Sequence, residues 1–325
     1  MEILALHPGA LGDIILSLPA LRLLREKFAG ARLTLAGNLD HLAIVPASCA
    51  DRKISLSSLP LQRLFGAPPV PREDVNFWMS FDRIVSWTGS EDPRFAANLG
   101  MIHPNALIAS WKPCASDKRH VSRIFADTLI PWVSYSDQLN CVTISPDPGE
   151  VAPALTWLRN RGWSPETPMI ALQPGAGSAS KRWALRHFAD TAERLLERRV
   201  GKILIIEGPA EPRLGSGLAE TLPAQDTLVA ASLPLGHLAA ILSMCRAYVG
   251  NDSGISHLAA AVGIPCVVIF GPTSDVHWAP LGPNLAVLRN TSGCAACAGG
   301  SSGTHTCLEN TSPGDVMRVL AAVLG

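Results

Sequence analysis

Three short polar segments of this 325-residue chain have the residue types needed to bind and transfer a charged group: residues 9–13, 173–181 and 251–257. Each follows a short apolar run that is typical of a buried strand. A turn between a strand and a helix offers backbone N–H groups and a partial positive charge, and both hold phosphates. In parallel sheets, ligands bind beyond the carboxyl ends of the strands. The pattern therefore predicts ligand-binding turns.

The first segment ends in a carboxylate, Asp13, after a loop with glycines at Gly9 and Gly12. Glycine lets the backbone approach a ligand closely, and a carboxylate beside such a loop can take the proton of an attacking hydroxyl. A residue at this position also has the ordinary alternative role of capping the following helix. We predict that Asp13 is a catalytic base and that the two glycines belong to an acceptor loop.

The second and third segments have the composition of a phosphate site. Small residues precede Lys181, whose charge can neutralise a leaving phosphate, and capping residues begin the helix after position 253. We predict that Lys181 is catalytic, and the candidates for donor binding are Gly175, Ala176, Asp252, Ser253, Gly254 and His257. The G-x-x-x-x-G-K-[ST] and G-x-G-x-x-G patterns are absent at these turns, which argues against ATP hydrolysis and against a dinucleotide dehydrogenase.

The elements that position these segments alternate between strand and helix in both halves of the chain. Apolar runs predict strands at 3–6, 32–36, 81–87, 106–109, 141–144, 169–172, 202–206, 247–249 and 266–270, and helices at 14–21, 186–199, 235–244, 258–263 and 315–324. This alternation predicts an α/β fold with two parallel sheets. A Pro- and Gly-containing break at 145–168 predicts a linker with a short helical piece around 154–161, and domains at 1–148 and 149–325.

Composition excludes several other classes. The chain has 27 basic and 27 acidic residues and only 6% aromatic residues, which argues against a general nucleic-acid binder. The apolar runs are shorter than the roughly 20 residues of a membrane span. The N-terminal segment lacks a basic start, and Gly9, Gly12 and Asp13 interrupt its apolar run, so we expect no signal peptide and a cytoplasmic protein.

A late cysteine cluster leaves two interpretations open. Cys294 and Cys297 form a C-x-x-C unit, and His305 and Cys307 follow, which gives four potential zinc ligands. The Gly- and Ser-rich spacing and the single C-x-x-C unit instead favour thiols without a metal, either unreactive or redox-coupled.

At the level of whole motifs, the chain resembles the ADP-heptose:lipopolysaccharide heptosyltransferases, glycosyltransferase family 9. The resemblance is carried by HPGALGD at 7–13 with LPAL at 18–21, by PGA at 174–176 with KRW at 181–183, and by GNDSG at 250–254 with HLA at 257–259. It implies a GT-B fold of two Rossmann-like domains facing across a cleft, with the acceptor on the first and the nucleotide-sugar on the second. By position, Asp13 matches the family's base, Lys181 its diphosphate lysine, and Asp252, Ser253, Gly254 and His257 its donor turn.

The resemblance implies inverting transfer of a heptose from ADP-heptose to the lipid A–Kdo inner core of lipopolysaccharide, with no cofactor or metal, and peripheral contact with the inner membrane. Basic residues suited to an anionic acceptor, or to a solvated surface, are Arg94, Lys112, Lys118, Arg119, His120 and Arg123. Three alternatives stay open: a GT-B enzyme with another donor such as UDP-GlcNAc, including an epimerase; a non-catalytic nucleotide-sugar-binding protein; and a dehydrogenase.

Overall fold

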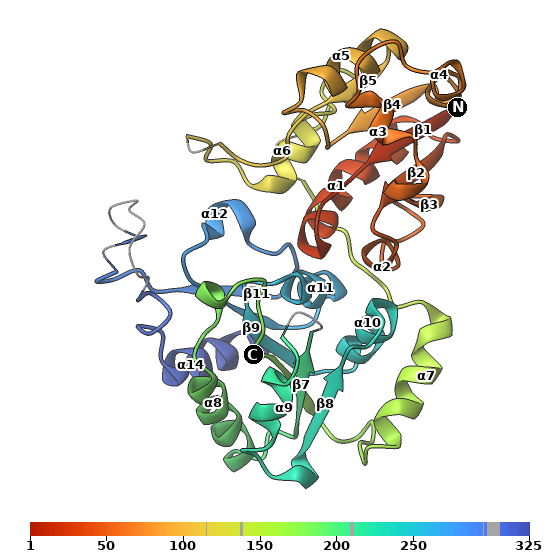
Figure 1. The fold of residues 1–325 in the computed structure, drawn as a ribbon. Coiled ribbons are helices and arrows are strands. Elements are labelled where there is room, and N and C mark those ends of the chain that lie inside the picture. The colour runs from red at the N-terminus through yellow and green to blue at the C-terminus, as the bar shows by residue number, and fades with distance from the viewer. Residues whose placement is uncertain (115, 137–138, 209–210, 295, 298–305) are drawn as a thin grey trace. The chain divides into compact units, whose positions relative to one another are not determined.

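The chain divides into two compact units, Met1–Val142 and Thr143–Gly325. The computed structural model describes residues 1–325 except 115, 137–138, 209–210, 295 and 298–305. Each unit is built on one parallel β-sheet with helices packed against it (Figure 1). The predicted α/β class with two parallel sheets is therefore confirmed.

The sheet of the first unit has the strand order β3-β2-β1-β4-β5. The strands are β1 (Glu2–Leu6), β2 (Arg32–Gly37), β3 (Arg52–Ser55), β4 (Arg83–Ser86) and β5 (Ala106–Ile108). After β3 the chain returns to the other side of β1, so the strand order reverses between β1 and β4. In open α/β sheets, a ligand crevice forms beyond the carboxyl ends of the two strands at such a reversal.

Helices pack against the apolar side chains of the first sheet. They are α1 (Leu11–Lys27), α2 (Leu39–Leu42), α3 (Leu61–Leu64), α4 (Arg72–Met79), α5 (Pro93–Ile102) and α6 (Val121–Asp127), with a 3₁₀ turn at Leu56–Ser58. Leu4 and Leu6 of β1 pack in one core cluster with Trp78 of α4 and Phe95 of α5. The helix α1 packs against α6.

The sheet of the second unit has the order β11-β10-β9-β6-β7-β8. The strands are β6 (Met169–Gln173), β7 (Lys202–Glu207), β8 (Thr227–Ala231), β9 (Ala247–Asn251), β10 (Cys266–Phe270) and β11 (Leu285–Arg289). β6, β9 and β10 are buried along their whole length, as expected for central strands covered on both faces. Here the strand order reverses between β6 and β9.

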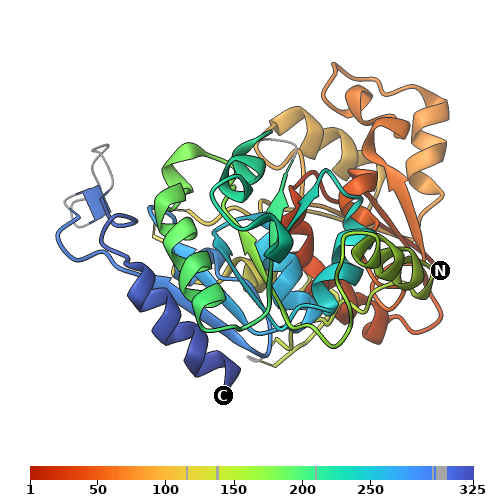
Figure 2. The same cartoon turned by 90° about the horizontal axis from the view of Figure 1, so that it is seen from below.

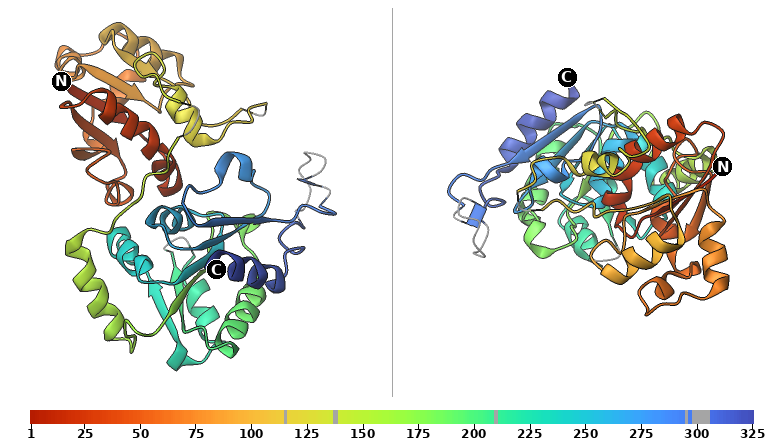
Figure 3. Two further views of the ribbon diagram at one scale, coloured as in Figure 1. Left: turned by 180° about the vertical axis from the view of Figure 1, so that it is seen from behind. Right: turned by 90° about the horizontal axis from the view of Figure 1, so that it is seen from above.

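The helices of the second unit include one that lies inside the expected linker. They are α7 (Pro148–Arg159), α8 (Leu185–Glu197), α9 (Leu214–Ala219), α10 (Leu235–Ser243), α11 (Gly254–Val262), α12 (Asp275–Trp278) and α14 (Pro313–Leu324), with 3₁₀ turns at Ala179–Lys181 and Ala224–Asp226. Figure 2 shows α14 beside α8. Figure 3 shows α7 beside α10, where Glu150 Oε2 lies 3.3 Å from His237 Nδ1.

The sequence reading was wrong at one strand and missed three others. Residues 141–144 form no strand, although Ile144 N–H donates to Ala261 O at 2.8 Å. The missed strands β3, β8 and β11 are all at sheet edges. Of these, β3 (RKIS) lacks an apolar run, whereas β8 (TLVAA) and β11 (LAVLR) have short apolar runs that the sequence reading overlooked. None of the described helices is long and apolar enough to cross a bilayer.

Candidate functional site

The turn after β1 holds the carboxylate of Asp13 in a defined position. Ala10 is the N-cap of α1, and Asp13 is the third residue of the helix. Asp13 Oδ2 accepts a hydrogen bond from Ala10 N–H at 2.9 Å. This interaction satisfies a backbone donor at the start of the helix and orients the carboxylate. Asp13 therefore also has the alternative role of capping α1.

His7 and Gly9 also hold the turn after β1 in place. The Nδ1 atom of His7 accepts a hydrogen bond from Gly9 N–H at 3.0 Å, so the neutral ring carries its proton on Nε2. Burial lowers the pKa of His7 from 6.5 to about 3, which keeps the ring neutral. A Cβ atom at Gly9 would lie 2.5 Å from Asp13 Cβ and 2.6 Å from His7 Cε1. Only glycine therefore fits between these two side chains.

A pocket of about 620 Å³ opens beside Asp13. The turns after β1, β4 and β5 line it, together with Phe65 at the end of α3. The lining residues are Pro8, Gly9, Ala10, Asp13, Phe65, Trp87, Thr88, Gly89, Ser90, Glu91, Asp92, Ser110, Trp111 and Lys112. The strands β1 and β4 flank the reversal of strand order, where a ligand crevice is expected. Gly12, which the sequence placed in the acceptor loop, is not among the lining residues.

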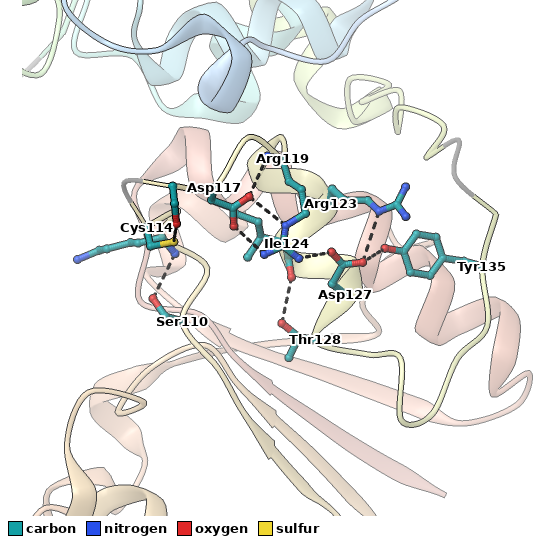
Figure 4. A network of polar contacts seen from close by, with 11 residues as sticks. Ser110, Cys114, Asp117, Arg119, Arg123, Ile124, Asp127, Thr128 and Tyr135 are labelled. Atoms are coloured by element: carbon teal, nitrogen blue, oxygen red, sulfur yellow. Dashed lines mark hydrogen bonds and ion pairs between the residues drawn. The ribbon is translucent and has the colours of Figure 1, made fainter. Parts of the chain in front are cut away.

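The segment after Lys112 is tied to α6 by ion pairs (Figure 4). Arg119 Nη2 lies 2.6 Å from Asp117 Oδ2, and its Nη1 lies 2.6 Å from Asp127 Oδ2. Asp127 also meets Arg123 Nε at 3.4 Å and accepts a hydrogen bond from Tyr135 Oη. Hydrogen bonds to Asp117 and then Asp127 raise the pKa of Arg119. These two guanidinium groups therefore serve internal pairing, while Lys112 is the basic residue that lines the pocket.

In the second unit, an ion pair joins the turns after β6 and β9. Lys181 Nζ lies 2.8 Å from Asp252 Oδ2, with exposed side-chain fractions of 32% and 6%. Asn251 bridges the same turns: its Nδ2 donates to Pro174 O at 2.8 Å, and its Oδ1 accepts from Trp183 N–H at 2.9 Å. Because β6 and β9 flank the reversal of strand order, the predicted donor residues gather where the sheet offers a ligand crevice.

The turn after β9 becomes the start of α11. Ser253 is the N-cap, and its Oγ accepts from Ser256 N–H at 3.4 Å and donates to Gln173 Oε1 at 3.0 Å. Gly254 is the first residue of the helix, and His257 lies buried in its first turn. A helix of nine residues that begins here directs its positive end toward the turn that carries Lys181.

Glu211 organises the turn after β6, and sequence reasoning missed it. Glu211 Oε1 accepts from Ala176 N–H at 3.0 Å and lies 2.9 Å from Arg182 Nη2. A Cβ atom at Gly175 would overlap the Glu211 carboxylate, so glycine is required there. The partners are 35 residues apart in sequence. No local sequence pattern predicts this contact. The same holds for the position of Trp111 in the first-unit pocket.

The cysteine cluster is also assembled in the second unit. The Sγ atoms of Cys294, Cys297 and Cys307 all lie within 4.8 Å of one another. All eight cysteines of the chain are described, and none of them forms a disulfide. His305, the fourth ligand considered from the sequence, lies outside the described residues.

Two parallel α/β sheets, each with polar turns at its reversal of strand order, are the features of a GT-B fold. Residues 147–305 match the family model of glycosyltransferase family 9 (heptosyltransferase). Lipopolysaccharide heptosyltransferase 2 of Escherichia coli K12 is 31% identical over 169 residues, 50% of this chain and 48% of the relative. The chain thus matches about half the length of such relatives.

Solved structures support the fold across the whole chain. The structure of E. coli ADP-heptose lps heptosyltransferase II aligns with a TM-score of 0.75 and 20% identity, covering 100% of this chain and 98% of that one. The E. coli heptosyltransferase WaaC with ADP aligns with a TM-score of 0.70 and 18% identity, covering 99% and 100%. At such identities, these likenesses establish the GT-B fold.

Proposed function

We propose that this chain is an inverting glycosyltransferase that transfers a heptose from ADP-heptose to the inner core of lipopolysaccharide. The match of residues 147–305 to the family model supports the reaction class, and the relatives' heptosyltransferase names support the sugar. The observation that carries the proposal is the position of Asp13. Its carboxylate is oriented by Ala10 N–H and lines a pocket at the reversal of strand order in the first sheet.

The transfer reaction needs a base for the acceptor hydroxyl and a site that stabilises the negative charge of the leaving group. The acceptor hydroxyl gives its proton to Asp13 as its oxygen attacks the anomeric carbon of the donor sugar. The bond between that carbon and the phosphate oxygen breaks, and ADP leaves with the electron pair. A single displacement of this kind inverts the configuration at the anomeric carbon.

On the donor side, we assign the diphosphate to the turns after β6 and β9. Lys181 carries the charge that stabilises the leaving group, and the start of α11 adds its backbone N–H groups. Asp252 holds Lys181 in place and accepts from hydroxyls of the sugar or ribose. In this assignment the cation and the helix replace the metal ion that other phosphate chemistry uses.

On the acceptor side, we assign the first-unit pocket to a sugar of the lipid A–Kdo core. Trp111 offers an aromatic face of the kind that packs against a sugar ring, and Ser110 and Ser90 offer hydroxyl groups. Lys112 supplies the positive charge for an anionic group on the acceptor. A lipid-linked acceptor places the chain at the cytoplasmic face of the inner membrane as a peripheral protein.

A two-stage assay with the purified full chain tests this function. Thermal-shift screening of ADP-, UDP- and GDP-sugars comes first, and transfer onto lipopolysaccharide with a truncated core follows. We expect stabilisation by ADP-sugars and a mass gain of one heptose on the acceptor. Stabilisation by a UDP- or GDP-sugar alone would contradict the assignment of ADP-heptose as the donor. Tight binding without release of nucleoside diphosphate would favour a non-catalytic binding protein.

A further inference from the structure

We propose that Cys294, Cys297 and Cys307 form a thiolate site for one divalent metal ion of the kind that prefers sulfur ligands in a tetrahedral arrangement. The site lies in the second unit and is independent of the transfer reaction proposed above. Its role is structural: it joins Cys294 and Cys297 to Cys307.

The spacing of the three sulfur atoms fits a metal better than a disulfide. All three lie within 4.8 Å of one another. In a tetrahedral site with metal–sulfur bonds of about 2.3 Å, sulfur atoms lie roughly 3.8 Å apart, which small side-chain rotations would reach. A disulfide needs a sulfur–sulfur distance of about 2.05 Å and uses only two of the three thiols.

The backbone brings these thiols together through contacts that do not involve sulfur. Cys294 N–H donates to Thr291 O at 3.1 Å, and Cys297 N–H donates to Cys294 O at 3.1 Å, so the C-x-x-C unit forms a turn. Asn310 Nδ2 donates to Ser292 O at 2.6 Å, which joins the segment before the turn to the segment after Cys307. The three ligands are therefore preorganised.

Two of the three cysteines in the cluster are almost fully buried, and Cys297 is half-buried. Cys294 and Cys307 are 1% and 0% exposed, and both pack in one small cluster with Ala296. Thiols bind such a metal as thiolates, so binding releases a proton from each of the three thiols to the solvent. Three thiolates supply three of four tetrahedral positions, and the fourth ligand comes from outside this set.

The cluster is connected to the donor turns through a short chain of contacts. Leu308, the residue after Cys307, packs in the main core of the second unit. Thr311 O accepts a hydrogen bond from Trp183 Nε1 at 2.9 Å, and Trp183 N–H donates to Asn251 Oδ1 at 2.9 Å. Loss of the metal should therefore lower the thermal stability of the second unit.

Elemental analysis of the purified full chain tests the site directly. Cells are grown in medium supplemented with zinc and iron, and metals are measured by inductively coupled plasma mass spectrometry. We expect close to one zinc or iron ion per chain, and less than a tenth of that in Cys297→Ser and Cys307→Ser. Cys114→Ser, which removes an exposed cysteine of the first unit, is the matched control and should keep the metal.

A second measurement begins with the unmodified chain. Cobalt exchanged into the unmodified chain should give the intense thiolate-to-cobalt absorption of a tetrahedral site, and Cys297→Ser should weaken it. Several results would overturn the proposal: substoichiometric metal in the unmodified chain, full metal content in Cys297→Ser, or a mass 2 Da below that of the fully reduced chain, which indicates a disulfide.

Discussion

Lys181 and Asp252 form an ion pair of 2.8 Å in which the lysine is one-third exposed and the carboxylate is almost fully buried. The pair joins the turns that follow β6 and β9, on either side of the reversal of strand order in the second sheet. A buried carboxylate that holds an accessible ammonium group fixes the direction of the cation without removing it from solvent. Because the lysine side chain is already ordered, binding a phosphate costs little further side-chain entropy.

Removing that cation should weaken donor binding. A charge-assisted hydrogen bond contributes about 1.5–3 kcal/mol, so Lys181→Ala should reduce affinity for ADP roughly 10- to 100-fold. Isothermal titration calorimetry measures the change. Lys202→Ala is the matched control, because Lys202 begins β7 at the other end of the sheet and donates to Gln225 O. Equal affinity for ADP in Lys181→Ala and the unmodified chain would remove Lys181 from the donor site.

Gly9→Ala should disable transfer while donor binding stays normal. The added Cβ would lie 2.5 Å from Asp13 Cβ and 2.6 Å from His7 Cε1, so the Asp13 carboxylate must move. A shift of this size in a reacting group costs on the order of 100-fold in rate. Gly100→Ala on α5 has open space around its Cβ and is the control in turnover assays. Unchanged turnover in Gly9→Ala would show that the position of Asp13 does not matter.

The parts of the fold that the sequence predicted are those with a local signature. The central strands β1, β6, β9 and β10 are continuous apolar runs, and Asp13 stands beside glycine at the end of the first run. Its role as a base and that of Lys181 as a donor ligand stay predictions. Glu211 meets Ala176 only because β6 and β7 lie side by side, and Trp111 reaches the pocket only because β5 pairs with β4. Contacts between distant segments of this kind have no local pattern.

The aromatic wall of the first-unit pocket gives a prediction about the acceptor. Trp111→Ala should raise the KM for the acceptor by up to about tenfold and leave ADP affinity unchanged, because a stacked aromatic face contributes roughly 0.5–1.5 kcal/mol. Steady-state kinetics with the acceptor varied at saturating donor measures this. Trp157→Ala on α7 removes a half-buried tryptophan of the second unit and is the control. An unchanged acceptor KM in Trp111→Ala would place the acceptor elsewhere.

His7 should make the first unit sensitive to acid. Its pKa is about 3 when folded and near 6.5 when unfolded, so below pH 6.5 the unfolded state takes up a proton that the folded state does not. Stability from this group is therefore lost as pH falls from 6.5 toward 3, by up to about 1.4 kcal/mol per pH unit. His7→Asn keeps an acceptor for Gly9 N–H without titrating.

Urea unfolding at pH 6.5 and 4.5 checks this prediction. The loss of unfolding free energy between the two pH values should be about 2 kcal/mol smaller in His7→Asn than in the unmodified chain. His277→Asn, on α12 of the second unit, is the control for removal of a histidine elsewhere. The same pH dependence in His7→Asn and the unmodified chain would mean that His7 takes up its proton while folded.

The most direct test of the central claim is heptose transfer by Asp13→Asn, measured together with its affinity for the donor. Asparagine keeps an oxygen that can accept from Ala10 N–H, so the turn should stay in place while the base is lost. Transfer from ADP-heptose to a truncated lipopolysaccharide core should fall by a factor of roughly 100 to 10,000, with unchanged donor affinity. Transfer at the rate of the unmodified chain would contradict the assignment of Asp13 as the base.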